Sequence, residues 1–226
     1  EAALAAEDIA VRRNPRAATA LTVTANARRV AQSAAYRDGL VELQDAGSQA
    51  VIEALPLAPG ARVLDYCAGG GGKTLALAAR LGGGPVAAHD AHPRRMSDLP
   101  ARAARAGARV AVTDAPRGPY DLVLADVPCS GSGAWRRAPD GKWRLLPDDL
   151  DRLRATQAAI LDTVAPMVAP GGHLAYVTCS VLPEENAGQV DAFAARHPGW
   201  EVTGGSAVLP DADGDGFYAA HLTRVR

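Results

Sequence analysis

Cysteine is scarce in this sequence of 226 residues. The three cysteines, Cys67, Cys129 and Cys179, lie far apart, and no two of them form a C-x-x-C pair. An odd number of widely spaced cysteines argues against a disulfide framework and against a structural zinc site, so no metal site is predicted. We expect free thiols and a cytoplasmic location. Free thiols raise the question of whether one of them is a nucleophile.

Long apolar runs and an excess of one sign of charge are also lacking. No apolar run reaches the length of a membrane span and no signal peptide is recognisable, so no membrane partner is expected. The net charge is −1, and the chain is 48% hydrophobic and 22% charged, a composition that is typical of a domain with a sizeable core. The chain begins at Glu1 rather than at a methionine, which leaves a preceding region open as an alternative.

Lysine is nearly absent, and the positive charge is unevenly distributed. The chain has 22 arginines and two lysines, and six arginines but no acid lie between residues 9 and 37. A second basic cluster is interleaved with two tryptophans and consists of Arg136, Arg137, Lys142 and Arg144 with Trp135 and Trp143. Such clusters are typical either of a solvated basic face or of RNA contact, because phosphates need cations and exposed bases stack on flat side chains.

Strand-like and helix-like segments alternate from about residue 41 onward. Strands are predicted at 62–66, 86–89, 109–113, 120–126, 173–178 and 217–225, and helices at 44–55, 73–81, 93–106, 148–168 and 184–196. This alternation predicts an α/β fold with a mostly parallel sheet covered by helices on both faces. No internal repeat or low-complexity linker is evident, so residues 41–226 are predicted to form one domain. Residues 1–40 are predicted to be helical pieces and loops and are a candidate for RNA contact.

The stretch LDYCAGGGGKTLALAAR, residues 64–80, is open to two interpretations. Its end resembles the phosphate-binding loop G-x-x-x-x-G-K-[ST], but Cys67 stands where that loop needs its first glycine, and no pair of magnesium-binding groups is evident. Alternatively, the glycines let the backbone approach a nucleotide-like cofactor, and the following helix presents free N–H groups. A P-loop nucleotide hydrolase therefore stays an alternative.

An aspartate follows each of three predicted strands, at Asp90, Asp114 and Asp126. The carboxyl ends of parallel strands share one edge of a sheet, where such sheets bind ligands. Asp90 lies 18 residues after Gly72, close to the spacing of an acid that binds ribose hydroxyls, and Asp114 is placed to face an adenine amino group. So many acids suit a cationic sulfonium better than a pyrophosphate, which favours S-adenosylmethionine as the cofactor.

Two cysteines also follow predicted strands, Cys129 in ADVPCSGSGAW and Cys179 in YVTCSVLPEEN, and each precedes a serine. A buried structural role is common for cysteine, so a methyltransferase on another substrate with structural cysteines stays an alternative. Cysteine chemistry, however, fits methylation of cytosine at carbon 5. A thiolate adds to carbon 6, carbon 5 attacks the methyl group, and loss of the carbon-5 proton then releases the thiol. Asp126 is a candidate for the acid that contacts the N3 or amino edge of the ring.

The segments DYCAGGGGKT, DVPCSGSGAWRRAPDGKW and TCSVLPEENAGQV closely resemble the Sun/RsmB-type RNA cytosine-5 methyltransferases, over about residues 35–225. The resemblance implies a class I S-adenosylmethionine-dependent methyltransferase (Rossmann-like) fold with a seven-stranded sheet. It implies that the chain forms 5-methylcytosine in ribosomal RNA, most often 16S, or less often in transfer RNA. A monomer is the default expectation.

The resemblance also implies roles for individual residues. It places the cofactor on the glycine loop and on the acids that follow the strands, namely Cys67, Ala68, Gly69, Gly70, Gly71, Gly72, Lys73, Asp90, Asp114 and Asp126. It makes Cys179 the nucleophile and Cys129 the group that assists product release, a ranking that the spacing alone leaves open.

Two departures from the family pattern stand out. Gly69 and Gly70 replace the Ala-Pro of the usual loop C-A-A-P-G-G-K, which loosens the loop before binding and predicts weaker cofactor affinity. Family members usually carry an N-terminal RNA-binding extension, but only about 40 residues precede the shared region here. A non-catalytic RNA-binding remnant is therefore a further alternative.

Overall fold

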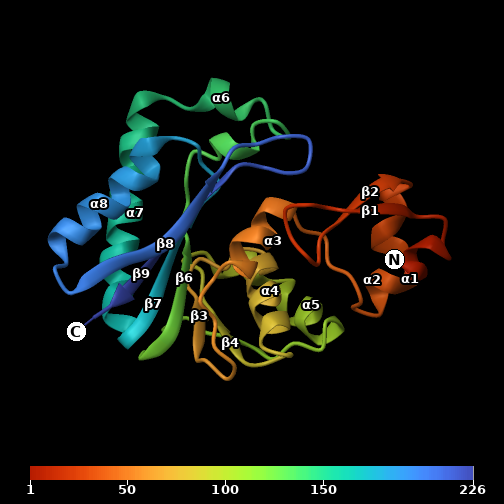
Figure 1. Ribbon diagram of the computed structural model, residues 1–226, viewed down its shortest axis with the longest axis horizontal. Helices are drawn as coiled ribbons and strands as arrows, with labels where there is room; N and C mark the ends of the chain where they lie inside the picture. Colours follow the sequence, from red (N-terminus) through yellow and green to blue (C-terminus); the bar gives the residue numbers. More distant parts are fainter. Residues whose placement is uncertain (226) are drawn as a thin grey trace.

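A seven-stranded sheet forms the centre of the protein in a computed structural model that describes residues 1–225 (Figure 1). Its order is β5-β4-β3-β6-β7-β9-β8. The strands are β3 (Val63–Asp65), β4 (Val86–Ala88), β5 (Val110–Val112), β6 (Tyr120–Asp126), β7 (Val168–Thr178), β8 (Trp200–Val208) and β9 (Phe217–Arg224). Strands β3 to β7 pair in parallel, whereas β9 is antiparallel to both β7 and β8. The predicted seven-stranded, mostly parallel sheet is confirmed.

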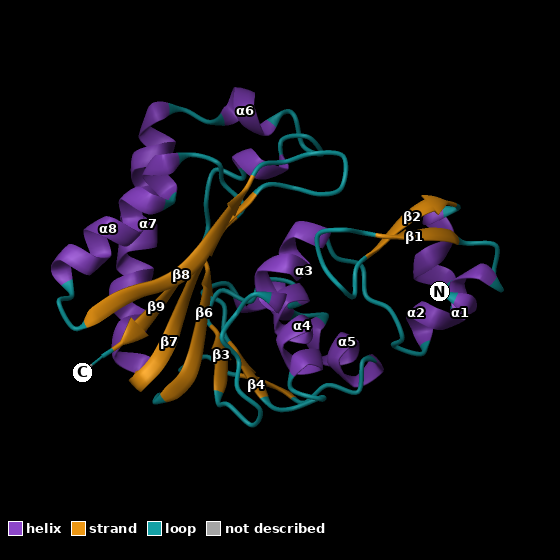
Figure 2. Cartoon of the chain, in the orientation of Figure 1, coloured by secondary structure: helices purple, strands orange, loops and turns teal. Residues whose placement is uncertain are grey.

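Helices cover both faces of the sheet, which Figure 2 shows as a twisted layer between two helical layers. One face carries α7 (Pro147–Val164) and α8 (Ala187–Arg196), and the other carries α3 (Ala46–Glu53), α4 (Gly72–Arg80) and α5 (Leu99–Arg105). Strand β6 explains this layering, because its side chains alternate between the faces. Val123 packs in the cluster with α7 and α8, whereas Leu122 and Leu124 pack in the cluster with α3 and α4.

The remaining elements are short. The α-helices are α1 (Ala2–Ala5), α2 (Ala34–Arg37) and α6 (Gly141–Arg144), and the 3-10 helices are η1 (Ala27–Gln32), η2 (Pro93–Met96), η3 (Ser132–Ala134), η4 (Ala165–Met167) and η5 (Pro183–Glu185). The helix predicted over residues 93–106 is therefore split into η2 and α5, and the helix predicted to reach residue 168 ends as η4. Among residues 1–225, no helix is long and apolar enough to cross a membrane.

The sequence analysis missed two strand elements. Strand β8 lies at the edge of the sheet with nearly all of its residues exposed, so it lacks the apolar alternation by which strands are recognised. The first 40 residues, predicted as helical pieces and loops, also contain an antiparallel hairpin of β1 (Ala10–Arg13) and β2 (Leu21–Ala25). The division into a segment 1–40 and a domain 41–226 stays a prediction.

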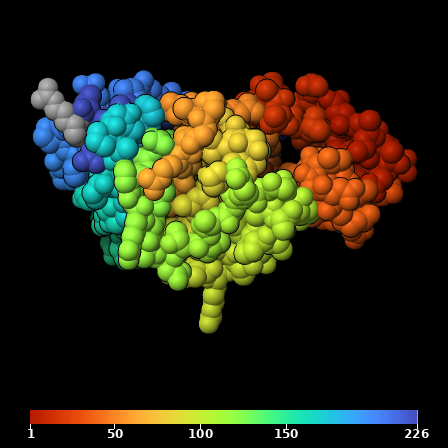
Figure 3. Space-filling model, turned by 90° about the horizontal axis from the view of Figure 1, so that it is seen from below, coloured from red at the N-terminus to blue at the C-terminus, as the bar shows by residue number. Residues whose placement is uncertain are grey.

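The N-terminal residues form a lobe at one end of the molecule (Figure 3). The lobe has its own small apolar cluster of Leu4, Ile9, Val30 and Ala35. A cavity of about 610 Å³ lies between the lobe and helices α3 and α4. Polar contacts elsewhere join the lobe to the rest of the chain.

Arg16 is the central residue of one such contact, between the hairpin and the loop that precedes β9. Its side chain is only 9% exposed and lies 2.8 Å from the Asp211 carboxylate. Its guanidinium also donates to the backbone carbonyls of Leu209, at 2.8 Å, and Asp215. The neighbouring Arg12 pairs with Asp213 at 2.5 Å. Arginines that the sequence offered as RNA contacts are thus partly neutralised by acids some 200 positions along the chain.

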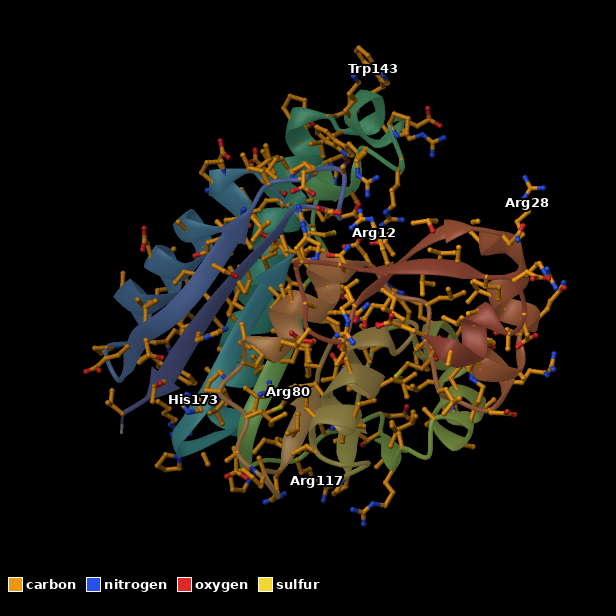
Figure 4. All side chains as sticks on the ribbon, turned by 45° about the vertical axis from the view of Figure 1, so that its right-hand side comes forward. Arg12, Arg28, Arg80, Arg117, Trp143 and His173 are labelled. Atoms are coloured by element: carbon orange, nitrogen blue, oxygen red, sulfur yellow. The ribbon has the colours of Figure 1, made fainter. Side chains whose placement is uncertain are left out.

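We predict that Arg16→Ala loosens the lobe without unfolding the sheet, because the substitution removes contacts to three residues of the loop before β9. Amide hydrogen exchange in β1 and β2 should speed up by roughly tenfold or more, while exchange in β6 should stay unchanged. The matched control is Arg28→Ala, because Arg28 is exposed and points into solvent (Figure 4). Equal protection of the hairpin in both variants would contradict this account of the attachment.

Candidate active site

The glycine loop between β3 and α4 has a backbone shape that requires glycine at specific positions. Gly69 and Gly71 have positive φ angles of 52° and 80°. A Cβ atom on Gly71 would lie 2.3 Å from Cδ1 of Leu99, so a side chain there would both strain the backbone and clash. Gly71 is also the N-cap of α4, which leaves the first N–H groups of this helix directed at the loop. The loop is therefore a tight turn that exposes backbone to a ligand.

Asp90, at the end of β4, is tied directly to this loop. Its carboxylate accepts from the backbone N–H of Gly69 and from that of His92, each at 2.8 Å. The residue is 4% exposed, and Arg95 pairs with it at 3.5 Å. Asp90 therefore fixes the loop and lies where the sequence predicted an acid. Its role toward a ribose stays a prediction.

Asp65 is a site residue that the sequence analysis missed. It is the last residue of β3, is 1% exposed, and accepts from Thr74 Oγ1 at 2.7 Å through Oδ2. Its Oδ1 has no hydrogen-bond partner among the described residues. Burial raises the pKa of Asp65 to about 7, and the nearby Asp126 adds to the shift. The sequence signal was present, since this aspartate closes the strand just before the glycines.

The donor set around the loop fits a cationic cofactor. The orphaned Oδ1 of Asp65 is buried near the carboxylates of Asp90 and Asp126, which raise the pKa of Asp65 further. A sulfonium or ammonium group beside these carboxylates would offset their repulsion, whereas a phosphate would add to it. The sequence-predicted Ala68 is 8% exposed and donates its N–H to the carbonyl of His89, so its role toward a cofactor stays a prediction.

Two further predicted cofactor residues, Cys67 and Asp114, lie in surroundings that differ from each other. Cys67 lies beside the same carboxylates, and burial together with those charges raises the pKa of its thiol, so this cysteine stays protonated. Asp114 lies two residues past β5, on the outermost strand of its side of the sheet, and is exposed. Its proposed contact with an adenine amino group stays a prediction.

Lys73 and Asp126 form a largely buried ion pair. Lys73 Nζ lies 2.8 Å from Asp126 Oδ2, and the lysine side chain is 12% exposed. Burial by itself lowers the pKa of Lys73, but the charge and hydrogen bond of Asp126 outweigh it, so the pKa is raised and the ammonium persists. The ammonium also lies 5.1 Å from the centre of the Phe217 ring. A lysine held in this way by a carboxylate argues against a phosphate-binding loop.

The two thiols that follow β6 and β7 are in contact. Cys129 Sγ lies 3.5 Å from Cys179 Sγ, and both residues are partly buried. The hydrogen bond from Cys129 lowers the pKa of Cys179, and the Lys73 ammonium acts in the same direction against burial and Asp126. The same hydrogen bond and burial raise the pKa of Cys129. Lys73 thus acts on Cys179 in the direction that favours a thiolate, and the assignment of Cys179 as the nucleophile stays a prediction.

The second basic cluster is only partly free to bind RNA. Arg137 and Arg136 pair with Asp215, at 2.5 and 3.5 Å, and this aspartate is 1% exposed. Lys142 and Trp143 instead lie on α6, with Lys142 Nζ 4.7 Å from the centre of the Trp143 ring. Trp143 is 78% exposed and projects from the molecule (Figure 4). Asp215 therefore offsets part of the charge of this cluster, its α6 part stays exposed, and RNA contact by the cluster stays a prediction.

Sequence reasoning also missed polar residues that link the two cysteine segments. They are Ser130, Gln157, Ser180 and the fully buried Glu185, which form a hydrogen-bonded cluster. Their signal was weak, because serine and glutamate near a turn are ordinary surface residues.

Among residues 1–225, no group of three or more His, Cys, Asp and Glu side chains could hold a metal ion.

We predict that the free energy of unfolding of Asp65→Asn, compared with that of the wild type, increases as the pH rises from 4 to 7. The unfolded state releases the Asp65 proton above pH 3.8, whereas the folded state keeps it until the pH reaches about 7. The stability of the wild type therefore falls as the pH rises between these two values. The amide mimics the protonated carboxyl, and the stability difference should grow by up to roughly 4 kcal/mol. Urea unfolding without cofactor measures it, and the exposed Asp114→Asn is the control. A pH-independent difference would show that Asp65 is ionised throughout.

Comparisons with known proteins show the family and the fold of this chain. The family model described as 16S rRNA methyltransferase RsmB/F matches residues 52–223. Ribosomal RNA small subunit methyltransferase B from Salmonella arizonae is 38% identical over 206 residues, covering 84% of this chain and 48% of the relative. The corresponding protein from Vibrio vulnificus is 36% identical with the same coverage. This chain thus spans about half the length of the curated relatives it matches.

Solved structures match over a larger share of the chain. The crystal structure of PH0851 has a TM-score of 0.90 and 29% identity, covering 98% of this chain and 55% of that one. NSun6 from Pyrococcus horikoshii, crystallised with SFG, has a TM-score of 0.77 and 21% identity, covering 87% and 56%. These matches establish the Rossmann-like methyltransferase fold and argue against the P-loop hydrolase. From its motifs, its fold and these relatives, the chain belongs to the RsmB/F family of 16S rRNA methyltransferases.

Proposed function

We propose that this chain is the catalytic part of an S-adenosylmethionine-dependent enzyme that forms 5-methylcytosine in 16S ribosomal RNA. The observation that carries the proposal is the contact of Cys129 and Cys179, 3.5 Å apart, at the sheet edge that holds the glycine loop. Two thiols of unequal pKa beside a buried ion pair suit covalent catalysis on a pyrimidine. The family name and the curated relatives support ribosomal RNA over transfer RNA.

S-adenosylmethionine would supply an electrophilic methyl group. Its cationic end suits the buried carboxylates of Asp65 and Asp126, and its ribose suits Asp90 beside the glycine loop. The structural neighbour NSun6 from Pyrococcus horikoshii was crystallised with SFG, an analogue of this cofactor, which supports the proposal. Gly69 and Gly70 stay the positions at which we predict a looser cofactor loop than in relatives with Ala-Pro.

The proposed reaction divides between the two thiols and the ion pair. The Cys179 thiolate adds to carbon 6 of cytosine, which makes carbon 5 nucleophilic toward the methyl group. Asp126 and Lys73 contact the N3 and amino edge and stabilise charge on the ring. After methylation, a base removes the carbon-5 proton, and the electron pair of that C–H bond expels the Cys179 sulfur. Cys129, the neighbouring thiol, assists this release.

The exposed part of the basic cluster supports RNA as the substrate. Lys142 and Trp143 on α6 offer a cation and a flat ring within one short helix, the combination that single-stranded RNA uses. Lys142 and Trp143 lie seven and eight residues after Trp135, the last residue of the Cys129 motif, and we propose that they guide RNA toward the thiols. The cytoplasmic location and the monomeric state stay predictions.

We predict opposite outcomes for the two cysteine substitutions. Cys179→Ser should lower methylation of a 16S fragment by roughly a thousandfold or more and abolish any covalent adduct, because the nucleophile is lost. Cys129→Ser should let the adduct accumulate as a slower band on a denaturing gel, because addition still occurs while release is impaired.

Other outcomes point to the alternatives. If the two results are exchanged, then the roles of Cys179 and Cys129 are exchanged. Full activity in the double variant would make both cysteines structural, in a methyltransferase with another mechanism. If the wild-type protein fails to bind S-adenosylmethionine in calorimetry, then the chain is a non-catalytic RNA-binding remnant.

We predict that Trp143→Ala weakens binding of a single-stranded RNA by roughly five- to a hundredfold, because stacking of one base on the ring is lost. Fluorescence anisotropy with a labelled oligonucleotide measures the affinity. The control is Leu146→Ala, because Leu146 is 61% exposed and lies three positions away but offers no ring. An equal effect of both substitutions, or no effect of either, would remove Trp143 from the RNA-binding surface.

A further inference from the structure

A single fully buried carboxylate, Glu185, is bonded to the residue that follows each cysteine. It accepts from Ser130 Oγ at 2.5 Å and from Ser180 Oγ at 2.6 Å, both through Oε2. Its Oε1 accepts from the Ser130 backbone N–H at 2.9 Å. Ser130 directly follows Cys129, and Ser180 directly follows Cys179. One side chain therefore joins the two segments from which the thiols project.

Glu185 is itself held rigidly. Gln157 of α7 donates from Nε2 both to Glu185 Oε1 at 2.9 Å and to the carbonyl of Pro128 at 3.0 Å. The hydroxyl of Tyr176, on β7, donates to the backbone carbonyl of Glu185 at 2.6 Å. Both Gln157 and Tyr176 have no exposed surface. The carboxylate is therefore fixed to the core and in turn fixes the turns above it.

A glutamate is unusual at the position of Glu185. Among the described residues, no Lys, Arg or His nitrogen lies within 4.0 Å of it, so four hydrogen bonds alone stabilise this group at zero exposure. Burial of a carboxyl group without a cationic partner is costly, and an apolar side chain would avoid that cost. The convergent hydrogen bonds therefore suggest a role beyond packing.

We propose that Glu185 is a positioning residue for the thiol pair, which ties the two Cys–Ser segments together and so holds the Cys129 and Cys179 sulfurs in contact. The proposal rests on the proposed function of Cys179 as the nucleophile. Geometry supplies the argument, because both serines converge on one carboxylate with their hydroxyl oxygens 3.2 Å apart.

The charges around the pair act on the two thiols differently. The pKa of Cys129 is raised first by its hydrogen bond to Cys179 and by burial, and the Glu185 carboxylate adds to this shift. The pKa of Cys179 is lowered first by its hydrogen bond with Cys129, burial and Asp126 raise it, and Lys73 lowers it. The titratable and charged groups that face the pair come from α4, β6, η3 and its C-terminal turn, β7 and η5, and they are Lys73, Asp126, Arg137, Tyr176 and Glu185.

Glu185→Gln tests the role of the charge with little change in shape. The amide keeps one acceptor for the Ser130 N–H and Gln157, and the serine hydroxyls can turn to accept from its NH₂ group. Glu184→Gln is the matched control, because this neighbour is exposed. Ser180→Ala is a second variant, which removes one arm of the link and leaves the carboxylate in place.

The assay is alkylation of each cysteine by iodoacetamide across a pH series, followed by mass spectrometry, with no RNA present. In the wild type and in Glu184→Gln, Cys179 should react faster than Cys129. In Glu185→Gln this preference should fall by roughly tenfold, because loss of the carboxylate charge should lower the pH at which Cys129 begins to react. Ser180→Ala should lower the preference less. In methylation assays, Glu185→Gln should lower kcat and leave the KM for RNA unchanged.

Two outcomes would overturn the inference, and a third separates it from the function on which it rests. If Glu185→Gln folds and keeps the wild-type preference and pH profile, then Glu185 is merely structural and the inference is wrong. If that variant does not fold, an unchanged preference in Ser180→Ala overturns the inference instead. If the wild type itself alkylates faster at Cys129, then the assignment of Cys179 as nucleophile fails, whereas a changed ratio in Glu185→Gln still supports the positioning role.

Discussion

The contact between the sulfurs of Cys129 and Cys179 is the feature on which the rest of the site depends. It exists because β6 and β7 are parallel neighbours, so that the residues after both strands meet at one edge. Contact alone would leave two equivalent thiols. The surrounding charges make them unequal, and an unequal pair can divide nucleophilic attack from product release. The sheet order brings the two thiols together, and the buried polar cluster and the ion pair lie around them.

Carboxylates at the same edge of the sheet repel one another, and a cationic cofactor would offset this repulsion. Asp65, Asp90 and Asp126 lie around the glycine loop, and burial leaves one oxygen of Asp65 without a partner among the described residues. Lys73 offsets part of this negative charge, and it also favours the thiolate on Cys179. A bound cation would therefore both stabilise the loop and complete the charge balance beside the thiols. Cofactor binding and the reactivity of Cys179 are therefore coupled, because Lys73 and Asp126 lie close to both.

Much of the architecture could be predicted from sequence because it depends on local pattern. The strands that lead to the site are apolar on both faces, and their carboxyl ends share an edge, so the glycine loop, Asp90, Asp126 and both thiols were predicted to lie close together. Strand β8 escaped prediction because it is exposed, and the β1–β2 hairpin because its residues are mostly polar or half-buried.

The sequence could not show which residues far apart along the chain form ion pairs or hydrogen bonds with one another. Arg12 could as well have bound RNA, but it pairs with Asp213, and Arg137 pairs with Asp215. Likewise, no feature of the local sequence shows that Glu185 is buried while the adjacent Glu184 is exposed. Such partners are selected by tertiary packing over long sequence separations, so only the three-dimensional arrangement distinguishes a free arginine from a neutralised one.

The most direct test of the central claim is a trapping experiment with RNA that contains 5-fluorocytosine. Fluorine at carbon 5 cannot leave as a proton, so the covalent intermediate persists after methyl transfer, and mass spectrometry of the digested complex identifies the modified residue. The account predicts a methylated nucleotide attached to the peptide that contains Cys179. Attachment at Cys129, or a methylated product with no protein adduct, would contradict it.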